Sequence, residues 1–227
     1  AWLRQWEMAY VWACRGVECA PHEPISHLLK AQIIVERAEE QALCNDLQVI
    51  VHAPGDEALS AQARQEFEEA ISEAERTSLQ FAAYPGDESN QALNLWKARG
   101  ASVFIPDYQN AVSLEEAVLS FPPTAMEVGA MLMAYRKIDL PAKAIKASKA
   151  EFIDTYGGKE VTEHPFVLTQ LSLAYAGADQ QKALDLAALA SQKAEISKVD
   201  QGSKRWPEVP MTYFLQAQLA LQAGFFG

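Results

Sequence analysis

The sequence has few of the residues on which metal sites and disulfide frameworks depend. Among its 227 residues are 3 cysteines and 4 histidines, and so small and odd a number of cysteines excludes a disulfide framework. Cys14, Cys19 and His22 form one sparse cluster, without the fourth ligand that a zinc site requires. The scattered histidines favour surface or helix-capping positions over metal ligation. We therefore expect no metal and no cofactor.

Motifs of the common enzyme classes are also missing. The chain has no G-x-S-x-G elbow, no glycine-rich phosphate loop and no H-E-x-x-H pair. The glutamates of residues 66–75 could supply a carboxylate pair, but no apolar pocket or metal partner accompanies them. A solvated helix face is the simpler interpretation of this segment. We expect the protein not to be an enzyme.

Basic residues are in the minority, and long apolar runs do not occur. The 19 lysines and arginines against 30 acidic residues give a net charge of −11, whose field repels nucleic acid and anionic membrane surfaces. The longest apolar stretch, Val128 to Tyr135, is far below the roughly 20 residues of a membrane-spanning helix. We expect the protein neither to bind nucleic acid nor to insert into a membrane. No targeting segment is visible, and neither compartment nor oligomeric state follows from the sequence.

A short phrase built around proline occurs three times in the first half of the chain. Pro21, Pro54 and Pro85 lie 33 and then 31 residues apart, a period typical of stacked helical hairpins. In the second and third copies the proline is followed by Gly-Asp-Glu. Proline ends the incoming helix, glycine allows a left-handed turn, and aspartate caps the next helix. The phrase therefore predicts a helix after each copy.

Three short segments admit two interpretations. Residues 47–53, 78–84 and 102–105 could be strands, and with helices between them they would begin the parallel sheet of an α/β protein. We favour helix ends for the first two, because their apolar residues continue helical stripes. The third stays open. The helix before it, Asp87–Arg99, is expected to end at Gly100.

The second half of the chain carries a clearer repeat. Apolar residues recur at positions i, i+3, i+4 and i+7 of a helix, and the pattern returns after 40 residues and again near the end. The three sets are Val128, Met131, Leu132 and Tyr135; Leu168, Leu171, Ser172 and Tyr175; and Phe214, Ala217, Gln218 and Leu221. Small residues follow the second set at helical spacing, which predicts a second helix packed closely against the first.

These residues resemble a known repeat family. Tyr175 with Leu171 before it, then Ala183 after a short turn and Ala190 beyond, resembles a tetratricopeptide repeat. The junction Tyr84–Asp87 is similar to the junction between repeats of that family. The spacing between copies varies from 31 to 40 residues or more, which indicates an irregular array.

The resemblance implies an all-α fold, a right-handed superhelical array of antiparallel helical hairpins, or α-solenoid. We expect one such domain over residues 1–227. Residues 2–14 predict a helix without an N-cap, as in a fragment of a longer chain. Its aromatic residues are suited either to a core or to an interface; they are Trp2, Trp6, Tyr10 and Trp12.

In such arrays, the resemblance implies that the first helices line a concave surface that binds peptides. We expect a non-enzymatic scaffold or adaptor that binds a protein or peptide partner. The alternatives are a regulatory domain that senses a small molecule and, third, an α/β enzyme. The positively charged stretch 136–149 is most simply solvated or complementary to the acidic helix 66–75, but it could also hold an acidic ligand, since an arginine fork suits a carboxylate. The expected binding residues are Gln65, Asn94, Met133, Arg136 and Lys143.

Overall fold

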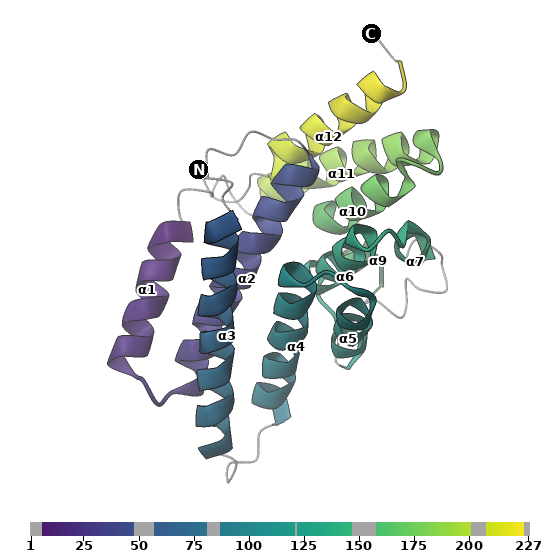
Figure 1. The fold of residues 1–227 in the computed structure, drawn as a ribbon. Helices are drawn as coiled ribbons and strands as arrows, with labels where there is room; N and C mark the ends of the chain where they lie inside the picture. Colours follow the sequence, from purple (N-terminus) through teal and green to yellow (C-terminus); the bar gives the residue numbers. More distant parts are fainter. Residues whose placement is uncertain are drawn as a thin grey trace. The chain divides into compact units, whose positions relative to one another are not determined.

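The computed structural model describes residues 6–47, 57–80, 87–120, 122–146, 158–200 and 208–224. Every regular element in these ranges is a helix, and no strand occurs in them (Figure 1). The all-α prediction is thereby confirmed for the part of the chain that is described. The residues group into two compact units, Ala1–Ala117 and Val118–Gly227, and each is described by itself. The expectation of a single repeat domain stays a prediction.

Unit 1 is built around α2, which packs against α1, α3 and α4. α3 also packs against α4, and Figure 1 shows α1, α2 and α3 side by side. The division between the units falls within the last turn of α5. The helices are α1 (Trp6–Cys19), α2 (Pro24–Asp46), α3 (Glu57–Gln80), α4 (Asp87–Phe104) and α5 (Tyr108–Leu119).

The helices of unit 1 begin where the proline phrases predict. α1 ends at Cys19 and α2 starts with Pro24 in its first turn, where proline costs no hydrogen bond because that N–H has no partner within the helix. α3 starts at Glu57 and α4 at Asp87, which are the last and the second-last residues of the second and third phrases. The prolines of those two phrases lie outside the described residues.

The strand interpretation is wrong wherever the three ambiguous segments are described. Leu47 is the C-cap of α2, residues 78–80 end α3, and residues 102–104 end α4. Residues 48–53 and 81–84 lie outside the described residues.

Gly100 does not end α4, contrary to the prediction. The helix continues to Phe104, and Gly100 lies inside it against the ring of Phe67 from α3. A Cβ at this position would lie 2.0 Å from Phe67 Cζ, closer than two carbons can approach. The glycine is therefore explained by the close approach of two helices, a use that looks the same in sequence as a helix stop.

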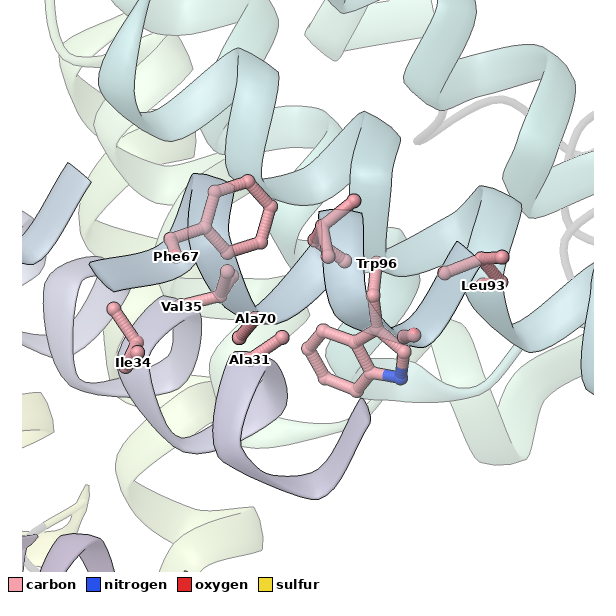
Figure 2. Close-up of a cluster of buried hydrophobic side chains, with 9 residues drawn as sticks. Ala31, Ile34, Val35, Phe67, Ala70, Leu93 and Trp96 are labelled. Atoms are coloured by element: carbon pink, nitrogen blue, oxygen red, sulfur yellow. The ribbon is translucent and has the colours of Figure 1, made fainter. Parts of the chain in front are cut away.

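The buried core of unit 1 lies where α2, α3 and α4 cross (Figure 2). Each large apolar side chain buried there contributes about 1.5–3 kcal/mol, so this crossing supplies much of the stability of the unit. The cluster consists of Ala31, Ile34, Val35, Phe67, Ala70, Ile71, Ala74, Leu93 and Trp96.

The aromatic residues of α1 differ in burial. Trp6 is buried, and Tyr10 packs against the core cluster of unit 1. Trp12 is 62% exposed, with the guanidinium carbon of Arg15 5.1 Å from its ring centroid. Trp2 lies outside the described residues.

Unit 2 is built around α10, which packs against α6, α7, α9, α11 and α12. α6 also packs against α7, and α11 against α12. α10 is buried along nearly its whole length, as expected for the central helix of a unit. The helices are α6 (Ala125–Lys137), α7 (Pro141–Lys146), α9 (Gly158–Thr162), α10 (Pro165–Tyr175), α11 (Gln180–Asp200) and α12 (Glu208–Gln222).

The first two copies of the apolar stripe lie on buried faces of α6 and α10. All four residues of the copy in α6 are buried. In α10, Leu168, Leu171 and Ser172 are buried and Tyr175 is half-buried. The stripe therefore identifies the packing face of both helices.

The predicted third copy of the stripe does not lie on the buried face of α12. Phe214 is 43% and Leu221 60% exposed, whereas Thr212, Leu215 and Leu219 are buried. The buried stripe is thus shifted by two residues from the predicted one. α12 is apolar nearly all round, so spacing alone does not distinguish its inner face from its outer face.

Small residues let α11 lie close against α10, as predicted. Ala183, Ala187 and Ala190 are fully buried. The hydroxyl of Ser172 donates to the carbonyl oxygen of Ala183 at 2.8 Å, a contact that requires the two backbones to approach closely. The hairpin formed by α10 and α11 is therefore tightly packed.

Replacing Ala183 or Ala190 with leucine should overpack this hairpin. We expect each change to lower the free energy of unfolding by about 1–3 kcal/mol, measured by urea denaturation. Ala178→Leu, in the turn between α10 and α11 where residue 178 is exposed, is the control and should be nearly neutral. Unchanged stability in both buried variants would contradict the packing described here.

Candidate functional site

The most notable polar contact in unit 2 joins α6 to α10. Arg136, in the last turn of α6, donates from Nε and Nη2 to Oε1 of Gln170, at 3.3 and 3.0 Å. Gln170 is fully buried in the middle of α10 and Arg136 is half-buried. The guanidinium therefore extends from the surface to the interior and holds an amide there.

The other end of the Gln170 amide has no partner. Its Nε2 is buried and makes no hydrogen bond among the described residues. Leaving a buried donor unpaired costs about 1–3 kcal/mol, and such groups are rare in folded proteins. Turning the amide over would place the NH2 group against the Arg136 donors, so the present orientation is the favourable one. The orphan donor therefore marks a position suited to an acceptor.

Lys143 follows the turn between α6 and α7, and its side chain lies over the ring of Tyr135. Asp139 adopts a left-handed conformation, with φ of 57°, and the N–H of Leu140 donates to the carbonyl oxygen of Tyr135 at 3.0 Å. The chain thus reverses, and the ammonium of Lys143 lies 4.9 Å from the ring centroid of Tyr135. Lys143 is therefore held beside Tyr135, the residue that precedes Arg136 in α6.

The remaining predicted binding residues lie elsewhere. Met133 is 2% exposed and belongs to the packed interior, not to an open surface. Gln65 is exposed on α3 and donates from Nε2 to Glu69 Oε1 at 2.9 Å. Asn94 is exposed on α4. The last two belong to unit 1, whereas Arg136 and Lys143 lie on either side of the turn between α6 and α7.

Gln170 was not identified from the sequence, although a signal was present. α10 reads PFVLTQLSLAY, in which Gln170 is a long polar residue between the apolar stripe positions Leu168 and Leu171. A buried polar side chain requires a partner. The sequence does not show which partner, because Arg136 is 34 residues away.

A shallow groove of about 280 Å³ lies between α9, the start of α10 and the second half of α11. The ammonium of Lys193 pairs with Glu163 at 2.5 Å and holds the pKa of that carboxyl below its usual value. Burial lowers the pKa of His164. The lining includes Lys159, Glu160, Glu163, His164, Lys193 and Ile196. Opposite charges are balanced along it, with an apolar wall at one side.

Unit 1 contains buried charges of a different kind. Arg99 is 2% and Glu39 4% exposed. Arg99 Nε donates to Glu39 Oε1 at 3.0 Å, Nη2 donates to Oε2, and the guanidinium carbon lies 4.1 Å from the ring centroid of Trp96. Burial raises the pKa of nearby Glu36, while Gln32 and Arg99 oppose the shift. The ion pair is closed to solvent on all sides, which indicates a structural role joining α2 to α4.

Neither a metal centre nor a membrane span is found in the described ranges. No three His, Cys, Asp or Glu side chains gather there in a way that could hold a metal ion. Cys14, Cys19 and Cys44 are free thiols. Within the same residues, no helix combines the length and apolar character needed to cross a membrane. In comparisons with known proteins, no family model, no curated protein and no solved structure matches this chain.

Proposed function

We propose that the chain is a non-enzymatic protein-interaction module whose unit 2 binds a carboxylate-bearing segment of a partner protein. The helix contacts of unit 2 support this proposal. Taking α6, α10 and α12 as first helices, neighbouring first helices pack together, and α7 and α11 each pack between their own first helix and the next. This is the packing expected of stacked helical hairpins, in which first helices line one surface. The right-handed solenoid is part of the proposal.

The observation that carries the proposal is the orphan donor of Gln170 beside Arg136. A carboxylate brought to this buried position would accept from both groups at once, since it offers two oxygens with about four acceptor positions. Arginine fits its planar geometry and remains charged at every physiological pH. Lys143 adds positive charge close by, within a chain whose net charge is −11. A carboxylate thus removes the penalty of the unpaired amide and is attracted by the local charge.

The proposal is tested by fluorescence polarisation with labelled octapeptide mixtures. One mixture lacks Asp and Glu and ends in a free carboxylate, a second ends in a carboxamide, and a third is the carboxamide with one internal Glu. We expect the first or the third mixture to bind and the second not to bind. Binding of the first indicates a terminal carboxylate, and binding of the third indicates a side-chain carboxylate. Equal binding of all three mixtures, or none by any, would overturn the proposal.

Variants of the site give a sharper test. Arg136→Ala and Gln170→Leu should each weaken peptide binding at least tenfold, and Arg136→Ala with Lys143→Ala should abolish capture at low and at high salt. Gln170→Leu removes the orphan donor together with the acceptor of the half-buried Arg136, so the two effects oppose one another and the melting temperature of the free protein should change little. Arg64→Ala, which removes the same charge from an exposed i,i+4 ion pair, is the control. Undiminished binding by the folded site variants would contradict the assignment.

The groove between α9 and α11 favours the second candidate function, binding of a small molecule. Its charge-balanced lining with the apolar Ile196 suits a small zwitterion better than a peptide. A thermal-shift screen of free amino acids distinguishes the two functions. A stabilisation that is lost in Lys159→Ala but kept in Arg136→Ala would support the second candidate.

A further inference from the structure

His164 connects the groove to the start of α10. It is the N-cap of this helix, and its Nδ1 accepts a hydrogen bond from the backbone N–H of Phe166 at 3.2 Å. A ring nitrogen that accepts carries no proton, so the neutral ring is protonated at Nε2. Pro165 follows in the first turn. The cap therefore depends on a neutral histidine.

The first turn of α10 carries a close contact between α10 and α6. The ring of Phe166 lies directly over Gly129 of α6, where an added Cβ would be 2.2 Å from Phe166 Cδ1. The same two helices carry Gln170 and Arg136, which meet further along at 3.0 and 3.3 Å. Phe166 and Gln170, four residues apart on α10, therefore both contact α6.

The charges around His164 are mixed. Among the described residues of the groove, α9 and the turn after it contribute Lys159, Glu160 and Glu163, and α11 contributes Lys193. Glu163 and Lys193 pair with each other and largely offset one another. The groove gives solvent a path to the ring, while burial favours its neutral form and lowers the pKa of His164.

We propose that His164 is a pH-sensitive cap of α10 that regulates binding at the Arg136–Gln170 site. The inference rests on the proposed function. Protonation places a proton on Nδ1, so the ring no longer accepts from the Phe166 N–H, and it brings positive charge to a helix N-terminus, which the helix dipole disfavours. The first turn of α10 loosens, Phe166 shifts over Gly129, and the contact between α6 and α10 weakens. Peptide affinity therefore falls in acid.

The direction of the effect follows from the burial of the ring. The folded state favours neutral His164, so its pKa lies below that of the unfolded chain, about 6.5. The contribution of the cap is complete above that pH and is lost as the pH falls through the lower pKa of the folded state. Between pH 7.5 and 5.0, affinity should fall about fivefold, the effect of one lost N-cap.

The test measures peptide affinity at pH 7.5 and 5.0 in wild type and in His164→Asn, since asparagine caps without titrating. In His164→Asn, we expect the difference in peptide affinity between pH 7.5 and 5.0 to shrink below about twofold. It should persist in the control His27→Gln, which replaces a histidine of α2 whose ring contacts the carbonyl oxygen of Pro21. Equal pH dependence in wild type and His164→Asn would overturn the inference, as would none in wild type.

A measurement without peptide separates this inference from the proposed function. Amide exchange of Phe166, corrected for its intrinsic pH dependence, should accelerate in acid in wild type but not in His164→Asn. If no peptide binds at either pH, the proposed function fails. The exchange rate of the Phe166 amide alone then tests whether His164 is a pH-sensitive cap of α10. Acceleration specific to wild type supports the cap, and unchanged exchange overturns it.

Discussion

Replacing Arg99 with methionine is expected to lower the free energy of unfolding of unit 1 by about 3–5 kcal/mol. Methionine fills a similar volume but leaves the Glu39 carboxylate buried without its partner. Both side chains are almost wholly inside, so water cannot replace the lost hydrogen bonds. The loss should be seen by urea denaturation at neutral pH.

The surface pair Lys97–Glu75, which also joins two helices of unit 1, is the matched control. Both of its side chains are more than 40% exposed, and Lys97→Met should cost less than about 1 kcal/mol. The double variant Glu39→Met with Arg99→Met should recover most of the stability, because apolar side chains can replace a buried ion pair at little cost. A loss of less than about 1 kcal/mol for Arg99→Met would contradict the burial of this pair.

Gly129→Ala should destabilise unit 2 by about 3 kcal/mol, the upper part of the range for overpacking. Alanine normally stabilises a helix by up to about 1 kcal/mol relative to glycine. Here the new methyl group would lie 2.2 and 2.3 Å from two carbons of the Phe166 ring, and the ring is buried. The steric cost of the clash exceeds the gain in helix propensity, so α6 and α10 must move apart. The melting temperature and urea midpoint should both fall.

Gly16, within α1, provides the opposite expectation. A Cβ there meets nothing within 4 Å, so Gly16→Ala should stabilise the protein by up to about 1 kcal/mol. Combining Gly129→Ala with Phe166→Leu should cost less than the sum of the two changes, since the smaller side chain makes room. Stabilisation by Gly129→Ala, or strictly additive losses, would contradict the contact.

Local rules predicted the helices well because each is set by a few neighbouring residues. Prolines and acidic residues mark the starts of α2, α3 and α4, and the repeated stripe identifies the buried faces of α6 and α10. The same rules failed where a tertiary contact decides. Gly100 has the appearance of a helix end until Phe67 is placed against it, and an apolar helix such as α12 presents two plausible faces.

The candidate site was predictable only in part. Arg136 and Lys143 were identifiable as a concentration of positive charge in an acidic chain. Met133 was misplaced, because the residue beside a packing stripe can face either the interior or solvent. Gln170 and the capping contact of His164 depend on which helices meet, and no local pattern encodes that. A polar residue inside an apolar helix was the one available signal.

The side-chain NH2 resonances of Gln170 test the central claim most directly. In a ¹⁵N-labelled protein they are assigned by their loss in Gln170→Leu, and they report on the donor that the proposal pairs with a carboxylate. Titration with the peptide mixture that binds should shift them saturably and downfield, at the affinity measured by polarisation, while the neutral carboxamide mixture leaves them unchanged. Peptide binding with unmoved Gln170 resonances would contradict the account.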